Sequence, residues 1–475
     1  MCGIAGVFGV DGASPILLDM LFALQHRGQE SVGLATRDDS GNIRVHKAMG
    51  LVKQVFTDDV VARFPGGTAI GHVRYPTAGK SDVANAQPHA LGLAQGSQFA
   101  VSSNGDIINY AELRRWLETE HGFTFLSDND GELIGRLIAF HAFVQKKPIE
   151  EAILAATEQL KGAFSTVVLY RDQMFVFRDP HGFRPLVMGH IGGRDAGAVR
   201  SEGTVFASES CSFGIVGAEL VREIEPGELV RLSPGQPVTT VARRPKQKRH
   251  CVFELIYFSR PDSQAFGERV YDIRLKIGAA LARGDDAIVP GDDLGVMPVP
   301  DSSNFVALGY ARAKNAAFDM GLLRNHYVGR TFIKPSQKSR DEGVRQKFHP
   351  LPGHFPGKRI VLVDDSIVRG TTLRKIVRMV RDAGAKEIHV RIGSPKVIGA
   401  CYYGIDTPKN DELIANRMSE VEIADYLGAD TLRYVTVPDF RTILGSFDDF
   451  CFACFNRDYM YPPEDYVQKT NAPNR

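Results

Sequence analysis

The sequence predicts two domains of different class, a layered α+β domain followed by an α/β domain with a mostly parallel sheet. Its 475 residues, 43% of them hydrophobic, are too many for one ordinary domain. The first half contains mainly short strands, whereas the second half alternates strands with helices. A basic, proline-bearing stretch, PVTTVARRPKQKRH, separates the two halves. We therefore expect domains at residues 2–240 and 241–475.

Short apolar runs and two amphipathic segments define the first domain. We expect strands in TAIGHVRY and QFAVSSNG, and a hairpin formed by STVVLY and MFVFRDP around RDQ. Helices are expected in SPILLDMLFALQHRG, with Ser14 as its cap, and in GELIGRLIAFHAFVQ. The alternation of the second domain runs through DLGVMPVP, NFVALGYARAKNAAF, RIVLVDD, TTLRKIVRMVRDAGA and EIHVRIGSP.

Composition excludes several classes of partner. Lys and Arg number 57 against 56 Asp and Glu, so no overall charge favours nucleic acid or an anionic membrane. We find no basic segment followed by an apolar stretch at the start, and no run of about 18 apolar residues. Six cysteines are too few for a disulfide scaffold in a chain of this length. These features predict a soluble, cytoplasmic protein without nucleic-acid or membrane partners.

The stretch KRIVLVDDSIVRGTTLRKIV predicts a phosphate site. An apolar strand is followed by two acids, a short loop and an amphipathic helix, so that loop N–H groups and the helix N-terminus face the same anion. It is not a Walker A loop, because no Gly-Lys-Ser/Thr follows the required spacing. A strand that ends in solvent-exposed acids before a plain helix cap is the alternative. The residues concerned are Asp364, Asp365, Ser366, Arg369, Gly370, Thr371 and Thr372.

The opening stretch MCGIAGVFGV places a thiol directly after Met1. If Met1 is removed, Cys2 carries a free α-amino group with a reference pKa of about 8, close to the value of about 8.5 for its thiol. One residue would then supply both a nucleophile and a general base. A small hydrophobic residue at the start of a buried strand is the alternative interpretation of Cys2.

The string VLVDDSIVRGTT closely resembles the 5-phosphoribosyl-1-pyrophosphate (PRPP) motif of type I phosphoribosyltransferases. The resemblance implies that the acids meet the ribose and the loop holds its 5-phosphate. It also implies a pyrophosphate loop in VPDSSN, which includes Ser302, and a Mg²⁺ site at Ser303, Asp364 and Asp365. The polar stretch RNHYVGRTFIKPSQKSRDEGVRQK is either a mobile lid or a solvated loop. The resemblance implies pyrophosphate contacts from its Arg330 and Lys334.

Five further segments, CGIAGVFG, LQHRGQES, GHVRYPTAG, NAQPH and SNGDI, resemble in order the glutaminase domain of the N-terminal-nucleophile amidotransferases. This resemblance implies an α/β/β/α layered domain in which Cys2 is the nucleophile and Asn104 with Gly105 forms the oxyanion hole. It further implies that Arg74 binds the α-carboxylate of glutamine. For the α-amino group of glutamine we expect Asp130, with Asp128 as the competing choice in SDNDGE.

Taken together, the two halves resemble the glutamine PRPP amidotransferase (amidophosphoribosyltransferase) family from Cys2 to about Pro463. The resemblance implies that glutamine, PRPP and water become 5-phosphoribosylamine, glutamate and pyrophosphate, the opening step of purine synthesis. It also suggests a homotetramer and feedback inhibition by purine nucleotides. Two alternatives are an amidotransferase that acts on a sugar phosphate, and a PRPP-binding regulator with a vestigial glutaminase domain.

The remaining cysteines predict a metal centre. CFAC and two distant cysteines can bind zinc or an iron–sulfur cluster, and spacing alone would favour zinc. In the resembled family, a structural 4Fe-4S cluster is held by four cysteines in these contexts, here Cys251, Cys401, Cys451 and Cys454. Cluster-bearing relatives commonly have a propeptide, but only Met1 precedes Cys2 here. Either maturation is simpler, with Met1 removal as the activation step, or the cluster does not carry over. Cys211, His26 and His72 are expected to be core or turn residues.

Overall fold

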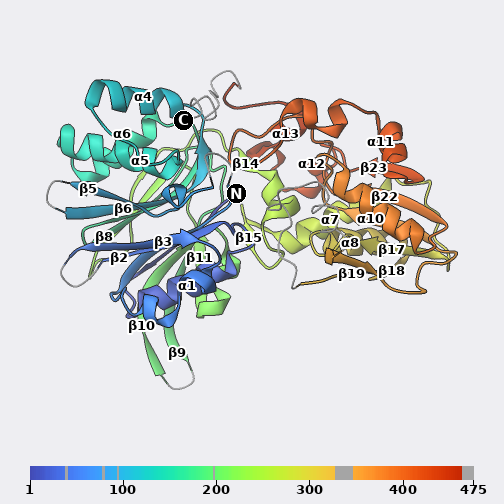
Figure 1. Ribbon diagram of the computed structural model, residues 1–475, viewed down its shortest axis with the longest axis horizontal. Helices are drawn as coiled ribbons and strands as arrows, with labels where there is room; N and C mark the ends of the chain where they lie inside the picture. Colours follow the sequence, from blue (N-terminus) through green and yellow to red (C-terminus); the bar gives the residue numbers. More distant parts are fainter. Residues whose placement is uncertain (38–40, 77–80, 94–95, 196–197, 327–345, 463–475) are drawn as a thin grey trace.

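The computed structural model describes residues 1–37, 41–76, 81–93, 96–195, 198–326 and 346–462. Two bodies lie side by side, the first formed by the N-terminal half of the chain and the second by the C-terminal half (Figure 1). In the first body, two antiparallel sheets lie face to face between helical layers, with α1 (Ala13–Ala23) on one side. On the other side lie α4 (Tyr110–His121), α5 (Asp130–Ala139) and α6 (Ile149–Gln159). The expected α/β/β/α layering is confirmed.

The two sheets of the first domain enclose a core of alternating apolar side chains, among them Ile4, Ile70, Val167 and Phe206. The seven-stranded sheet runs in the order β11 (Ala218–Glu223), β9 (Val187–Asp195), β10 (Ala198–Ala207), β1 (Gly3–Phe8), β4 (Thr68–Arg74), β2 (Ser31–Arg37) and β3 (Ile43–Met49). The six-stranded sheet runs in the order β13 (Thr239–Arg243), β12 (Glu228–Leu232), β8 (Gln173–Arg178), β7 (Gly162–Tyr170), β6 (Gly96–Ile107) and β5 (His89–Leu93). The expected β7–β8 hairpin is confirmed.

Three local features of the first domain differ from expectation. Ser14 does not cap α1, because Gly12 occupies the N-cap position and the Ser14 hydroxyl donates to the carbonyl of Phe64 instead. Helices α4 and α6 were not predicted, although the buried Tyr110, Leu113 and Leu117 of α4 have helical spacing. Strand β13 pairs with β12 and crosses the boundary proposed between residues 240 and 241, which stays a prediction.

The second domain contains a five-stranded parallel sheet, as the alternation of strands and helices predicts. Its strand order is β18 (Ala317–Phe318), β17 (Leu294–Pro298), β21 (Arg359–Asp364), β22 (Glu387–Ile392) and β23 (Thr431–Tyr434). The accompanying helices are α7 (Val270–Arg283), α8 (Asn304–Lys314), α10 (Thr371–Asp382) and α11 (Glu420–Leu427), with short helices α12 (Phe440–Ile443) and α13 (Ala453–Asn456). A short parallel pair joins β14 (His250–Cys251) to β24 (Phe450–Cys451), two segments far apart in the sequence.

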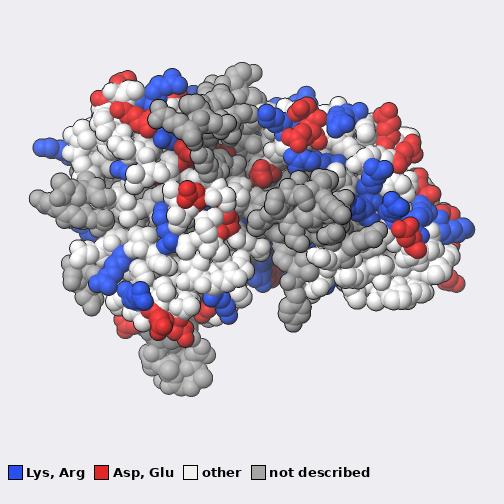
Figure 2. All heavy atoms as spheres, viewed as in Figure 1, with Lys and Arg blue, Asp and Glu red and all other residues white. Residues whose placement is uncertain are grey.

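Charged side chains of both signs are interspersed over the surface, with basic residues gathered over α10 in the second domain (Figure 2). This distribution agrees with the nearly equal numbers of basic and acidic residues in the sequence. Among the described residues, no helix has the length and apolar character needed to cross a membrane.

The domains meet at a buried cluster of charges. Arg27 of the first domain donates to Glu254 of the second through both terminal nitrogens, at 3.0 and 2.7 Å, and also pairs with Glu209. All three side chains are fully buried. Arg184, also of the first domain, lies 3.4 Å from Glu254. Because a buried charge is costly unless it is paired, this cluster constrains how the two domains can be placed.

Helices α7 and α8 cross at two glycines. A Cβ atom added to Gly309 of α8 would lie 2.1 Å from the carbonyl oxygen of Leu275, and one added to Gly278 of α7 would lie 2.0 Å from that of Val306. The backbones therefore touch at this crossing, which supports the sheet next to the PRPP-type loop.

We expect Gly309→Ala to lower the free energy of unfolding by about 1–3 kcal/mol, because the added methyl group overpacks the crossing and outweighs the better helix propensity of alanine. The measurement is the thermal denaturation midpoint, which should fall by several degrees. Gly214→Ala is the control, since a Cβ there meets no atom within 4 Å and the φ of Gly214 is ordinary. A midpoint for Gly309→Ala at or above that of the parent would contradict this account of the crossing.

Candidate functional site

The first candidate site forms where the two sheets of the N-terminal domain meet. In the antiparallel β1–β4 pair, Gly3 lies opposite Val73, so Cys2 and Arg74 stand at the same end of neighbouring strands. The partly buried Cys2 thiol donates to the carbonyl oxygen of Tyr75 at 3.6 Å. From the other sheet, the side-chain oxygen of Asn104 accepts a hydrogen bond from the Cys2 backbone nitrogen at 3.2 Å.

Asn104 and Gly105 are placed to bind a negatively charged oxygen next to Cys2. Asn104 is 1% exposed, and its Nδ2 has no hydrogen-bond partner among the described residues. An unpaired buried donor is costly unless a ligand uses it, and an oxyanion is such a ligand. Gly105 must remain glycine, because a Cβ atom there would lie 1.8 Å from the carbonyl oxygen of Ala163.

The two acids proposed for the glutamine amine differ in their surroundings. Asp128 is drawn toward α4, where its carboxylate pairs with Arg114 at 2.8 Å. Asp130 begins α5, and its carboxylate accepts from the backbone nitrogen of Ile107 at 3.4 Å, on the same strand as Asn104. Asp130 therefore lies nearer the oxyanion residues. Arg74 is 2% exposed and pairs with Glu30.

Met1 lies at the boundary between the domains. Its side chain is 1% exposed and packs with the apolar core of the second domain. Its sulfur accepts from Arg184 at 2.6 Å. Burial lowers the pKa of the Met1 α-amino group to about 5. With Met1 attached, the Cys2 nitrogen is a peptide nitrogen, which has no lone pair available to accept a proton.

The second candidate site lies at the carboxyl ends of β17 and β21. Because these strands are parallel neighbours, the loops that follow them meet. Ser302 donates to Asp365 at 2.6 Å, and Ser303 donates to Asp364 at 3.1 Å. The Ser366 hydroxyl also donates to Asp365, at 2.7 Å. The two sequence-predicted loops are thus joined by two hydrogen bonds, and the third lies within the Asp364–Asp365 loop.

Burial, followed by the charge of Asp365, raises the pKa of Asp364 well above its usual range, and burial also raises the pKa of Asp365. A buried carboxylate, Asp365, and a partly buried one, Asp364, with hydroxyl neighbours form the hard oxygen donor set that Mg²⁺ prefers, and a divalent cation would relieve their mutual repulsion. The residues present therefore fit the implied metal ion.

Within the rest of the phosphate loop, Arg369, Thr371 and Thr372 are exposed, whereas Gly370 is buried. Gly370 adopts a φ of 72° at the N-cap of α10, and Thr371 and Thr372 form the exposed first turn of that helix. A left-handed glycine at this point leaves the N–H groups of α10 facing the loop. Arg369 is exposed and pairs with Glu412 at 2.8 Å. Arg330 and Lys334 lie outside the described residues.

All four cysteines predicted as ligands line one small cavity. Cys251 and Cys451 face each other across the β14–β24 pair. Burial raises the pKa of Cys251 to about 11 and, together with the nearby Cys251 thiol, that of Cys451 to about 12. Neutral thiols are therefore expected until a metal displaces their protons. Cys401 and Cys454 complete the set.

The spacing of these cysteines bears on the kind of metal centre. Thiolates about 2.3 Å from one zinc ion must lie within about 3.8 Å of each other in a tetrahedral site. In the part of the chain that is described, no three His, Cys, Asp or Glu side chains converge enough to hold a single ion. In an iron–sulfur cluster each cysteine binds a different iron, so wider spacing is required. A cavity lined by four cysteines supplies the ligand type that both kinds of metal centre use.

The cysteine-bearing loop touches the oxyanion strand. A Cβ atom at Gly404, whose φ is 100°, would lie 3.2 Å from the carbonyl carbon of Gly105. Arg184 donates to the carbonyl oxygen of Tyr403, and the Tyr403 ring stacks on Phe183 with centroids 4.4 Å apart. The cavity and the Cys2 site are therefore neighbours across the domain boundary.

Comparison with known proteins matches both halves of the chain. A family model described as a glutamine amidotransferase domain matches residues 77–213, and one described as a phosphoribosyl transferase domain matches residues 275–392. Amidophosphoribosyltransferase 2, chloroplastic, of Arabidopsis thaliana is 46% identical over 98% of this chain and 81% of its own length. The amidophosphoribosyltransferase of Methanothermobacter thermautotrophicus is 42% identical over 98% and 95%.

The chain belongs to the amidophosphoribosyltransferase family. Two solved structures agree, each 38% identical and covering 98% of this chain. One, described as the allosteric regulatory enzyme of purine biosynthesis, has a TM-score of 0.88 over 98% of its own chain. The other, glutamine PRPP amidotransferase from B. subtilis complexed with ADP and GMP, has a TM-score of 0.86 over 99% of its chain. The function is that of a glutamine PRPP amidotransferase, which performs the first step of purine biosynthesis.

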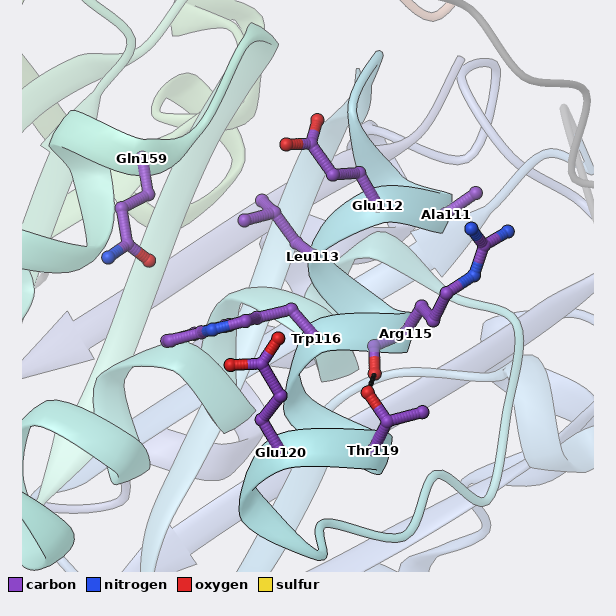
Figure 3. A pocket seen from close by; sticks show the side chains of 8 residues that line it. All are labelled: Ala111, Glu112, Leu113, Arg115, Trp116, Thr119, Glu120 and Gln159. Atoms are coloured by element: carbon purple, nitrogen blue, oxygen red, sulfur yellow. Dashed lines mark hydrogen bonds between the residues drawn. The ribbon is translucent and has the colours of Figure 1, made fainter.

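Several residues that shape this amidophosphoribosyltransferase were not singled out from the sequence. Nothing in the sequence showed that the side chains of Arg27, Arg184 and Glu254 would meet. An open hollow between α4 and α6 was not predicted either (Figure 3). It is lined by Trp116 and mostly polar neighbours, and it contains none of the predicted site residues.

We expect Asp130→Asn to raise the KM for glutamine by about 10- to 100-fold, because an ionic hydrogen bond to the substrate amine would be lost. Asp128→Asn is the matched control, since the Asp128 carboxylate already pairs with Arg114. The measurement is the steady-state rate of glutamate formation against glutamine concentration, with ammonia-dependent activity unchanged in both variants. A raised KM in Asp128→Asn alone would reverse the assignment.

Proposed function

We propose that glutamine is hydrolysed at Cys2 and that the released ammonia attacks PRPP at the Asp364–Asp365 loop. The observation that carries this proposal is the unpaired, buried Nδ2 of Asn104 beside Cys2, because a catalytic oxyanion gives this costly donor a use. The second domain of the same chain supplies a diacid loop with the donors that a ribose phosphate requires.

In the first half-reaction, removal of Met1 frees the Cys2 α-amino group, which accepts the thiol proton. The thiolate attacks the side-chain amide carbon of glutamine, and the oxyanion is held by Asn104 Nδ2 and the Gly105 N–H. The protonated α-amino group then donates its proton to the leaving amide nitrogen, so that neutral ammonia departs and a thioester remains. Water then releases glutamate and restores the thiol. The side-chain oxygen of Asn104 keeps the amine oriented throughout.

In the second half-reaction, the α10 N-terminus and the residues from Ser366 to Thr372 hold the 5-phosphate, and Asp364 and Asp365 meet the ribose hydroxyls. Ser302, Arg330 and Lys334 are the proposed contacts to pyrophosphate. When bound at Ser303, Asp364 and Asp365, Mg²⁺ supplies charge neutralisation for the leaving pyrophosphate. The nitrogen of ammonia bonds to C1 of the ribose as the C1–O bond to pyrophosphate breaks. Ammonia is nucleophilic only while unprotonated, so a path shielded from water should join the two sites.

The cysteine cavity is proposed to hold a 4Fe-4S cluster with a structural role. The cavity shared by all four cysteines supports this assignment. When bound, the cluster supplies four covalent links that join β14, β24 and the loop of Cys401. These links would fix the loop that packs on Gly105.

Regulation, assembly and location complete the proposal. The relative from B. subtilis was solved with ADP and GMP bound, and we propose that purine nucleotides inhibit this chain as well. A homotetramer in the cytoplasm is the proposed assembly and location.

We expect Cys2→Ala to abolish glutamine-dependent phosphoribosylamine formation and to retain formation from ammonium salts, because only the glutaminase nucleophile is removed. The measurement is pyrophosphate release with each nitrogen donor. Equal loss of both activities would contradict separate sites. If the parent protein shows neither activity, the result favours a PRPP-binding regulator with a vestigial glutaminase domain.

Protein purified without oxygen should contain about four iron atoms and four acid-labile sulfides per chain, as expected for one 4Fe-4S cluster. Cys454→Ser should lower both contents, whereas Cys211→Ser should not, because Cys211 lies outside the cavity. Metal analysis and a sulfide assay provide the measurement. One zinc ion per chain without iron would refute the cluster.

A further inference from the structure

Gln87 lies behind the oxyanion residues and does not face the substrate site directly. Its side chain is buried, at 3% exposure, and its amide makes two hydrogen bonds to the backbone of Ser103, the residue before Asn104. Ser103 N donates to Gln87 Oε1 at 2.7 Å, and Gln87 Nε2 donates to Ser103 O at 3.0 Å. The side-chain amide thus pairs with Ser103 as a neighbouring strand would.

The register of the sheet explains this arrangement. In the antiparallel β5–β6 pair, His89 lies opposite Val101, so the ladder continued by two residues would place position 87 opposite Ser103. The backbone ladder ends at His89, the first residue of β5, and the Ser103 backbone bonds to the Gln87 side chain instead. The Gln87 amide replaces the missing backbone partner, and the Ser103 N–H and C=O would otherwise be buried without a bond on that side.

The Gln87 amide has no freedom to turn away. The second N–H of the Gln87 amide points to His72 Nε2 at 3.2 Å. Because an amide nitrogen can only donate, the ring nitrogen of His72 is the acceptor in this hydrogen bond. On the opposite side, a Cβ atom added to Gly131 would lie 2.4 Å from Gln87 Oε1, so the amide packs on the first turn of α5, next to Asp130. Asn85 of the same segment accepts from the backbone nitrogen of Asp128 at 2.9 Å.

We propose that Gln87 is a positioning residue for glutamine hydrolysis: its side-chain amide holds the Ser103 backbone so that Asn104 Nδ2 and the Gly105 N–H keep the geometry that the oxyanion requires. Asn104 is the next residue on β6, so a shift at Ser103 moves both oxyanion donors. The same amide packs against Gly131 and thereby fixes the position of the preceding residue, Asp130, relative to the two oxyanion donors. This inference rests on the proposed function and adds a residue that does not touch the substrate.

The test is a double-mutant cycle with Gln87→Met, which keeps the volume of the side chain and removes its hydrogen bonds. Gln87→Met should lower kcat for glutamine by about 10- to 100-fold, since a small misplacement of oxyanion donors has an effect of this size. Ammonia-dependent activity should stay at the parent value. In the Asn104→Ala background, Gln87→Met should cause little further loss, because the group that it positions is already absent.

The matched control is Gln173→Met, since Gln173 also lies in the first domain but donates to Ser233 away from the site. It should leave both activities unchanged. If Gln87→Met does not fold, Gln87→Glu replaces it; this variant can still accept from the Ser103 N–H but sets a carboxylate oxygen against the Ser103 carbonyl, so kcat for glutamine should fall here as well.

The inference is overturned if the fold-loss of kcat for glutamine in the double variant equals the product of the losses in Gln87→Met and Asn104→Ala. It is equally overturned if Gln87→Met lowers the glutamine- and ammonia-dependent activities together. It is also overturned if Asn104→Ala is impaired while both Gln87 variants match the parent, and in that case the proposed function stands. The proposed function itself is refuted instead if the parent protein forms no glutamate from glutamine, or if Asn104→Ala forms it at the full rate of the parent.

Discussion

The pairing of Arg27 with Glu209 and Glu254 is the interaction on which the arrangement of the two domains depends. Arg27 lies in the first domain and Glu254 in the second, and both are fully buried. Removing one partner would leave an uncompensated buried charge, so the domains must meet in a geometry that keeps the pairs intact. The same guanidinium donates to the Cys2 carbonyl oxygen at 2.9 Å, which ties the position of the proposed nucleophile to the contact between domains.

This constraint also places the cysteine cavity. Arg184 lies beside Glu254, lines the cavity and donates to Tyr403, so the loop of Cys401 approaches the oxyanion strand at Gly105. A structural metal centre at this position would act on glutamine hydrolysis through packing and without electron transfer. The two active sites, by contrast, are built at strand ends in separate sheets, which suits two reactions that share only a small intermediate.

Much of the site was predictable because short motifs carry it. Cys2 and the Asp364–Asp365 pair stand in segments whose local structure brings their donors together, and the parallel sheet makes the Ser302 loop their neighbour. The preference for Asp130 over Asp128 came from the sequence motif, and it stays a prediction. The sequence did not show that Asp128 pairs with Arg114, because the pattern did not reveal the helix that carries Arg114. Ser14 failed as a cap because α1 begins at Ala13, which places Ser14 inside the first turn, where its hydroxyl donates to the carbonyl of Phe64.

The sequence by itself determined the two fold classes and the function, and it predicted the residues proposed to perform the chemistry, because hydrophobic periodicity and catalytic motifs are local properties of the chain. Only the tertiary structure decided that four distant cysteines share one cavity, that Arg27 and Glu254 pair across the domains, and that the Gln87 amide completes the ladder beside Asn104. These contacts join residues separated along the chain, and they form because buried charges and backbone groups must find partners wherever the fold brings them.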